Sequence, residues 1–130
     1  MKYLCLVYAD EESLAALSGS EWDALLRENL ELCEELRKSG HYVSASPLDP
    51  VQTAITLRVR NGKVSTTDGP FAETKEQLGG YYLIEARDLS EAIKVAGRIP
   101  GARLGSIEVR RITAHDPREP WTRPRELSKR

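Results

Sequence analysis

The stretch that decides the fold is Lys2–Ala9, KYLCLVYA, which is apolar at both alternating sets of positions. In an extended strand, alternate side chains point to opposite faces of the sheet. The two faces carry, respectively, Tyr3, Cys5 and Val7, and Leu4, Leu6 and Tyr8. Apolar residues on both faces predict a central strand that is covered on both sides.

Two segments with helical spacing lie further along the chain. Ser18 with Glu21, or Ser20 with Asp23, offers a capping box for a first helix over about residues 20–39. A second helix is predicted after residue 88, where an aspartate precedes a glutamate by three positions, and Pro100-Gly101 ends it. The apolar stripe of the first helix consists of Trp22, Leu25, Leu26, Asn29, Leu32, Cys33 and Leu36.

The remaining apolar segments predict strands. Asn61-Gly62 is a strong hairpin signal between residues 55–60 and 63–67, and one face of this hairpin is expected to be solvated. Further strands are expected at about 41–46, 81–86 and 105–112. The predicted class is therefore α+β, in the ferredoxin-like βαββαβ order with an extra β-hairpin, and both helices are expected on one sheet face. A homodimer that closes sheet against sheet would cover the other face.

The 130 residues are expected to form one domain over residues 1–112, followed by a charged, proline-rich arm at 113–130 in which Trp121 is a possible anchor. The formal net charge of −1 gives no field that would attract nucleic acid or an anionic membrane. No apolar stretch approaches the length of a membrane span, and the opening residues do not resemble a signal peptide. The expected location is the cytoplasm, with Cys5 and Cys33 reduced and packed in the core.

The segment after the predicted hairpin reads TDGPFAETKE over residues 67–76, followed by LGGYYLI over 78–84. These residues resemble the signature of the DGPF-domain proteins, a branch of the YCII-related family, and the likeness extends over residues 1 to about 112. The resemblance implies a dimeric α+β barrel, usually bacterial, related in fold to small isomerases and cofactor-free monooxygenases. It also implies a possible sigma factor association, because some members are fused to, or encoded beside, proteins of that kind. Short YCII proteins are proposed to use a His–Asp pair, but Asn29 stands on the first-helix stripe here, where no histidine occurs.

Two residues are candidate proton carriers. Asp68 follows a predicted strand, so its carboxylate either accepts backbone N–H bonds in an Asx turn or projects into a cleft as a general base. His41 opens the second strand, where it either caps the surface or acts as an acid or base.

A pocket between the sheet and residues 68–80 is predicted to bind a small organic molecule. Its ligand-binding candidates are Tyr8, Asn29, Phe71, Glu73 and Lys75. The mixed charges of this segment have a plainer interpretation as a solvated network. The spacing of histidines and cysteines predicts no metal site, and Gly79-Gly80 is expected to precede a strand rather than to open a phosphate-binding helix, so no cofactor is expected.

The sequence leaves three functions open. The first is an uncharacterised DGPF-type homodimer that binds a small molecule. The second is a cofactor-free enzyme of isomerase or lyase type, in which Asp68 or His41 moves a proton and Lys75 stabilises an oxyanion. The third is an adaptor for a sigma factor that uses Trp121 as its handle.

Overall fold

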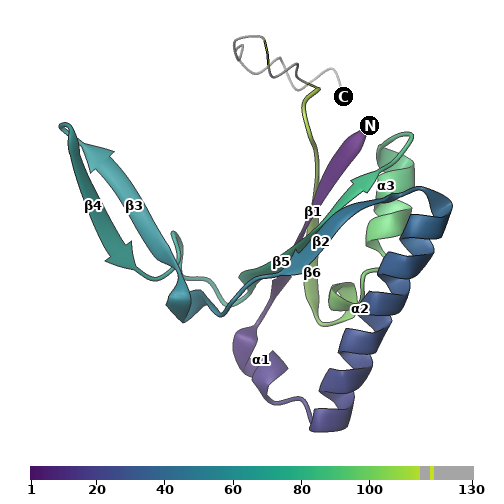
Figure 1. The fold of residues 1–130 in the computed structure, drawn as a ribbon. Helices are drawn as coiled ribbons and strands as arrows, with labels where there is room; N and C mark the ends of the chain where they lie inside the picture. Colours follow the sequence, from purple (N-terminus) through teal and green to yellow (C-terminus); the bar gives the residue numbers. More distant parts are fainter. Residues whose placement is uncertain (115–117, 119–130) are drawn as a thin grey trace.

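A computed structural model of the chain describes residues 1–114 and 118 (Figure 1). The main sheet contains β1 (Lys2–Ala9), β2 (Tyr42–Pro47), β5 (Gln77–Glu85) and β6 (Gly105–Arg111). These strands are antiparallel and lie in the order β2-β5-β1-β6. The α+β class is therefore confirmed, and the predicted strands and helices follow one another in the predicted order, with one additional short helix after β1.

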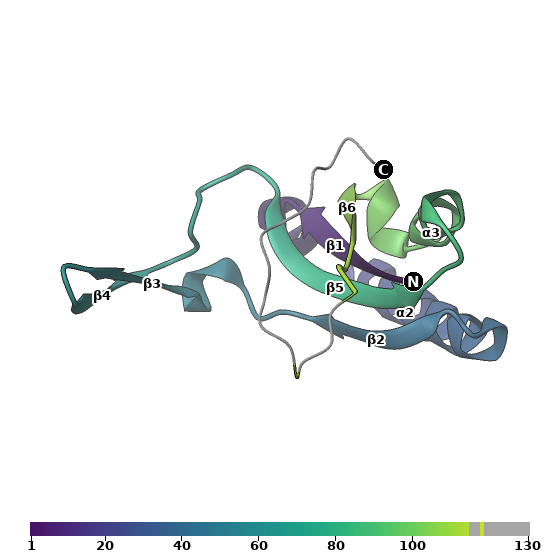
Figure 2. The ribbon, with the colours of Figure 1, turned by 90° about the horizontal axis from the view of Figure 1, so that it is seen from above.

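Strand β1 is central, as its sequence predicts, because it pairs with β5 on one side and β6 on the other. Tyr3 and Cys5 are buried beneath the helices, whereas Leu4 and Leu6 on the opposite face are only half-buried. Within the described residues, helices cover one face of the sheet and leave the other, here called the open face, without a helix (Figure 2). The expected cover on both sides is thus present on one side of the single chain.

The helices that cover the sheet are α2 (Gly19–Ser39) and α3 (Leu89–Ala96). The capping box at the start of α2 is the Ser18–Glu21 one: Ser18 Oγ accepts the Glu21 N–H at 3.1 Å, and the Glu21 carboxylate accepts the Ser18 N–H at 2.9 Å. These bonds lower the pKa of Glu21 below its usual value. The alternative box at Ser20 and Asp23 does not form, because both residues already lie inside the helix. Asp88 caps α3 as predicted.

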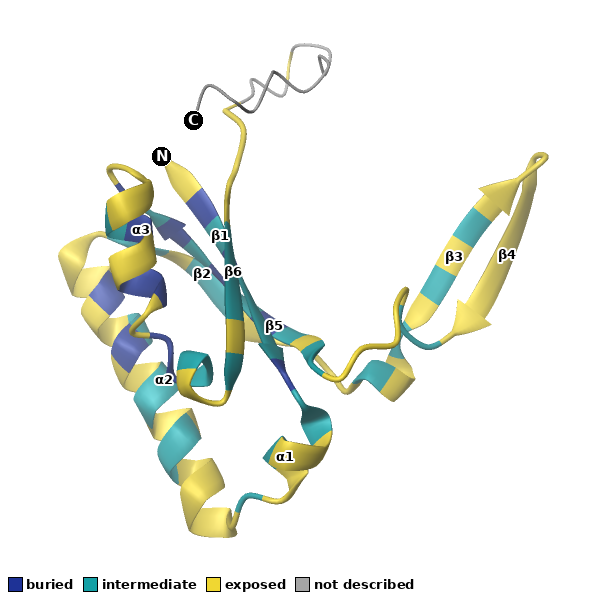
Figure 3. Ribbon diagram, turned by 180° about the vertical axis from the view of Figure 1, so that it is seen from behind, coloured by how far each residue is buried: buried dark blue, intermediate teal, exposed yellow. Residues whose placement is uncertain are grey.

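The predicted apolar stripe of α2 is buried only in its C-terminal half. Leu32 and Leu36 are buried in the core, whereas Trp22 and Leu26 are exposed. Figure 3 shows the reason, since the first turns of α2 extend past the end of the sheet. A short helix, α1 (Glu11–Ala15), which the sequence reading did not predict, joins β1 to this overhanging end.

The core lies between the sheet and the two helices. It combines side chains from the helix-facing side of β1 and β5 with those of α2 and α3. Its members are Tyr3, Cys5, Leu32, Leu36, Tyr82, Ile84, Ala86, Ala92, Val95, Ala96 and Ile99. Cys5 and Cys33 are both free, but only Cys5 is fully buried, and burial raises the pKa of its thiol to about 11.

Strands β3 (Ile55–Arg60) and β4 (Lys63–Asp68) form a separate two-stranded sheet, the hairpin. Its turn has positive φ at Asn61 (51°) and Gly62 (72°), the backbone that a two-residue hairpin turn requires. The hairpin projects from the sheet on the side opposite α2 and α3 (Figures 1 and 3). Its apolar face is therefore as exposed as its polar face, and the expectation of a single solvated face is wrong for the isolated chain.

Strand β5 begins at Gln77, four residues before its predicted start. Gly79 and Gly80 are consequently inside the strand, where Gly80 pairs with Val7 and Pro47.

The dimeric barrel requires two chains, whereas the structure describes one, so the barrel stays a prediction. Most of the expected arm, including Trp121, lies outside the described residues. In the described part, no helix combines the length and apolarity that crossing a membrane requires.

Candidate functional site

The loop that carries the DGPF sequence, residues 69–76, joins the hairpin to the main sheet and is here called the motif loop. Its first residue is fixed by the hairpin, because the Gly69 N–H donates to the Ala54 carbonyl at 2.7 Å and Thr56 Oγ1 donates to the Gly69 carbonyl at 2.9 Å. Its last turn is held by Thr74, whose hydroxyl donates to the Glu76 carbonyl at 2.5 Å. Both ends of the motif loop are thus held by hydrogen bonds to backbone carbonyls.

A pocket of about 320 Å³, here called the loop pocket, lies between the motif loop and the short 3₁₀ turn Val51–Thr53. The base of this region is ordered by Glu11, whose N–H donates to Gln77 Oε1 at 3.2 Å and whose carboxylate accepts the Val51 N–H at 3.0 Å. Gln77 Nε2 in turn donates to the Thr74 carbonyl at 3.0 Å. The pocket lining consists of Val51, Gln52, Pro70, Glu73, Thr74 and Gln77.

The predicted loop residues occupy different positions relative to this pocket. Glu73 lines it, whereas Asp68, Phe71 and Lys75 are exposed outside the lining. Asp68 ends β4 opposite Ile55, and among the described residues its carboxylate has no hydrogen-bond partner. The Asx-turn bond that the sequence suggested is therefore not formed. Phe71 is 81% exposed, and the Arg58 guanidinium lies 5.8 Å from the centre of its ring.

Tyr8 and Asn29 lie on opposite sides of the main sheet. Tyr8 is on the open face, where its hydroxyl is 3.5 Å from Glu108 Oε1. Asn29 projects from α2 toward the covered face and accepts a hydrogen bond of 2.5 Å from the Tyr82 hydroxyl, while its amide nitrogen donates to the Leu25 carbonyl at 2.9 Å. Burial raises the pKa of Tyr82, so this phenol is a hydrogen-bond donor. The structure does not bring these two residues to one site.

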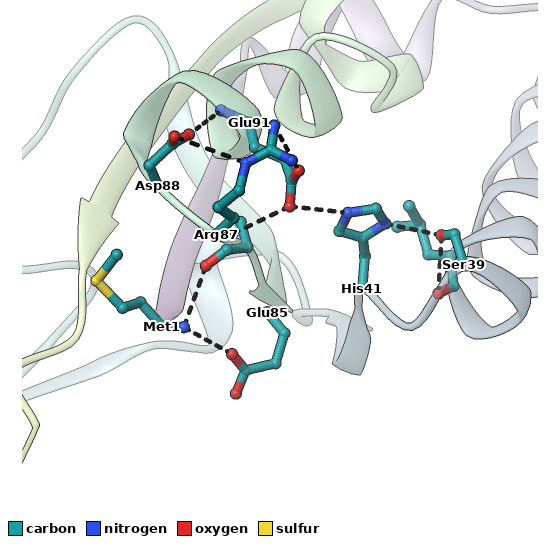
Figure 4. Close-up of polar contacts among 9 residues, drawn as sticks. Met1, Ser39, His41, Glu85, Arg87, Asp88 and Glu91 are labelled. Atoms are coloured by element: carbon teal, nitrogen blue, oxygen red, sulfur yellow. Dashed lines mark hydrogen bonds and ion pairs between the residues drawn. The ribbon is translucent and has the colours of Figure 1, made fainter.

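A second polar cluster, at the other end of the sheet, surrounds His41 (Figure 4). Ser39 Oγ lies 2.7 Å from His41 Nδ1, and His41 Nε2 lies 3.2 Å from Glu91 Oε1. Arg87 holds the same carboxylate through its backbone N–H at 3.0 Å and its guanidinium at 3.2 Å. These contacts, the Arg87 N–H above all, lower the pKa of Glu91 below its usual value.

The cluster borders a shallow pocket of about 280 Å³, the histidine pocket. The sequence reading selected His41 but missed Ser39 and Glu91. Ser39 is only two residues away and could have been noticed, whereas Glu91 is 50 residues distant and was interpreted as a helix-capping residue. Nothing in the sequence pattern indicates that Glu91 meets His41.

Asp68 and His41 belong to opposite ends of the molecule. The motif loop leads into β5 at Gln77, and the N–H of Glu85, the last residue of that strand, donates to the His41 carbonyl at 2.8 Å. A strand of nine residues spans roughly 30 Å. The two candidate proton carriers therefore cannot act on one small substrate within a single chain.

The described residues form no cluster of metal ligands. Within residues 1–114 and 118, no three histidine, cysteine, aspartate or glutamate side chains gather in a way that could hold a metal ion.

Comparison with known proteins adds two findings. The model of the YCII-related domain matches residues 1–121. An uncharacterised protein of Rhizobium meliloti (strain 1021) is 37% identical over 121 residues, which cover 92% of this chain and 98% of that protein.

Proposed function

Because the chain belongs to the YCII-related family, we propose that it is a homodimer that binds a small organic molecule in the loop pocket. The observation that carries the proposal is the pocket itself, which is formed by the family-like motif loop and by the start of β5. Its volume of about 320 Å³ is at the lower end of the range for small-molecule sites.

The lining favours a polar ligand. Glu73 offers a carboxylate, Thr74 a hydroxyl, and Gln52 and Gln77 side-chain amides, whereas Val51 and Pro70 supply apolar surface. An ionised carboxylate accepts hydrogen bonds and donates none. A ligand with amine or hydroxyl groups on a small apolar frame is therefore the best match to these side chains.

The open face of the sheet supports the dimer. Leu4, Leu6 and Leu83 are half-buried there beside Tyr8 and Tyr81, and in the described part of the chain no helix covers them. A second copy would cover them with the same surface, as a two-fold axis requires. Removing this apolar area from water would stabilise the association.

A thermal-shift screen against a metabolite library would test ligand binding, with wild type beside Glu73→Gln, Asp68→Asn and the control Glu31→Gln. Glu31 is an exposed residue on α2, away from the pocket lining. A ligand that raises the melting temperature of wild type and Glu31→Gln, but not of Glu73→Gln, is the expected result. Equal shifts in all four proteins would reject the loop pocket as the site. A selective loss in Asp68→Asn would extend the site to that carboxylate.

The Ser39–His41–Glu91 contacts favour a second candidate, a cofactor-free isomerase or lyase in which His41 moves a proton. An ionised Glu91 would stabilise the imidazolium that forms when His41 accepts a proton. Lys75 belongs to the motif loop, at the other end of β5, so it is not part of this version of the enzyme. Isotope exchange from deuterated water into a ligand, lost in His41→Gln, would test it.

The sigma factor association stays a prediction, since its expected handle, Trp121, lies outside the described residues. Failure to co-purify with any sigma factor would count against it.

A further inference from the structure

The apolar side chains of the hairpin lie on one of its faces. Strand β3 directs Ile55, Leu57 and Val59 to that face, where their cross-strand partners are Asp68, Thr66 and Val64. The apolar members of this face are Ile55, Leu57, Val59 and Val64. These four residues, here called the apolar stripe, are between 51% and 67% exposed. The opposite face carries Thr56, Arg58, Arg60, Lys63, Ser65 and Thr67.

An apolar stripe of this kind is unusual on a free two-stranded sheet. Isolated two-stranded hairpins are marginal in water, and contiguous exposed apolar residues usually mark an interaction surface. The described part of the chain leaves the stripe exposed, because the hairpin stands away from the main sheet. A covering surface would therefore have to come from outside residues 1–114 and 118.

The direction of the hairpin favours a second copy of the chain as the partner. It projects on the side of the open face, where Leu4 and Leu6 are also uncovered (Figures 1 and 3). A second copy that covers the open face would therefore lie alongside the hairpin. By two-fold symmetry, each chain would also lie against the hairpin of the other, so one arrangement covers four apolar surfaces.

We propose that the hairpin is an arm that packs its apolar stripe on a second copy of this chain. The inference rests on the homodimer of the proposed function and goes beyond it by assigning the hairpin to the interface. Stable interfaces bury about 800 Å² per partner, and the arm would extend the contact beyond the open face toward that size. The basic face, with Arg58, Arg60 and Lys63, stays toward solvent.

Sedimentation equilibrium on wild type, Leu57→Lys and Thr67→Lys tests the arm. Leu57 lies on the apolar stripe, and Thr67 is an exposed residue of the same hairpin on the opposite face, so the added charge is matched. The expected result is a dimer dissociation constant about tenfold or more higher for Leu57→Lys, because a lysine would enter an apolar interface. Thr67→Lys is expected to stay within about twofold of wild type.

The outcomes separate the arm from the dimer itself. A monomeric wild type would overturn both the dimer and the arm. Equal dissociation constants for all three proteins would leave a dimer through the open face and overturn the arm. Ligand binding to the loop pocket is tested independently by the thermal shifts.

Photo-crosslinking covers the case in which Leu57→Lys unfolds the hairpin. Benzoylphenylalanine at position 57, in a mixture of ¹⁴N- and ¹⁵N-labelled protein, is expected to give crosslinked peptides that join a light chain to a heavy chain. The same group at position 67 is the control. Crosslinks from position 57 that stay within one chain, including to its own residues 113–130, would overturn the arm, as would no crosslink at all.

Discussion

The hydrogen bond between Tyr82 and Asn29 gives the sharpest test of the core. Tyr82 is 5% exposed, and its hydroxyl donates to Asn29 Oδ1 at 2.5 Å across the interface between β5 and α2. Tyr82→Phe removes the hydroxyl donor, so the partly buried amide oxygen of Asn29 loses this hydrogen bond. Leaving such a group unsatisfied costs about 1–3 kcal/mol, so unfolding is expected roughly 4–12 °C lower.

Tyr42→Phe is the matched control. Tyr42 is half-buried on the neighbouring strand β2, and its hydroxyl makes no hydrogen bond with another described residue. The substitution therefore removes one hydroxyl, as Tyr82→Phe does, but breaks no hydrogen bond. The expected change in unfolding free energy is below about 0.5 kcal/mol.

The assay is urea denaturation at one fixed protein concentration, completed by Asn29→Ala and the double variant. Because the two side chains contact each other, the double variant is expected to cost less than the sum of the single ones, by about 1 kcal/mol or more. Strict additivity would refute the reasoning and show that this hydrogen bond does not stabilise the fold. Asn29 would then remain a candidate for the ligand-binding role that the sequence suggested.

Three further outcomes are expected. A thiol reagent should modify Cys33 in the native protein and Cys5 only on unfolding, and equal reaction rates for the two thiols would contradict this. Burial raises the pKa of Cys5 from 9.0 to about 11, so the contribution of this thiol to stability should be lost as the pH rises between those values. The pKa of Glu91 is lowered in the folded state, so its contribution is present above its usual value of 4.5 and lost as the pH falls through the folded pKa; acid denaturation of Glu91→Gln should lack this component. Gly105→Ala should cost roughly 2 kcal/mol or more in chemical denaturation, because its Cβ would lie 2.0 Å from a backbone oxygen of β1, whereas Gly19→Ala, with open space around it, should cost much less.

Features that depend on neighbouring residues were predictable from the sequence. The capping box at Ser18 and Glu21, the Asp88 cap and the Asn61-Gly62 turn each involve residues at most three positions apart. Their geometry follows from local backbone preferences, which the sequence states directly. The central position of β1 was also predictable, because a strand that is apolar on both faces is typical of the interior of a sheet.

The candidate site was less accessible. The motif loop was recognised, and Glu73 lines its pocket, but Asp68 and Lys75 lie outside the lining. The length of β5 separates the motif loop from His41, whereas the sequence offered Asp68 and His41 as alternative proton carriers for the same reaction. Residue types alone could not distinguish these cases, because exposure and distance depend on the packing of the whole sheet.

By itself, the sequence determined the α+β class, the succession of strands and helices, the local caps and turns, and the family likeness of residues 67–76. Only the tertiary structure decided that Glu91 meets His41 across 50 residues, that Asn29 bonds Tyr82, and that the hairpin leaves the sheet on its open side. The physical reason is that strand register and helix docking are set by the sum of many contacts between distant residues. A local pattern determines which face of an element is apolar, whereas the assembled fold determines what that face contacts.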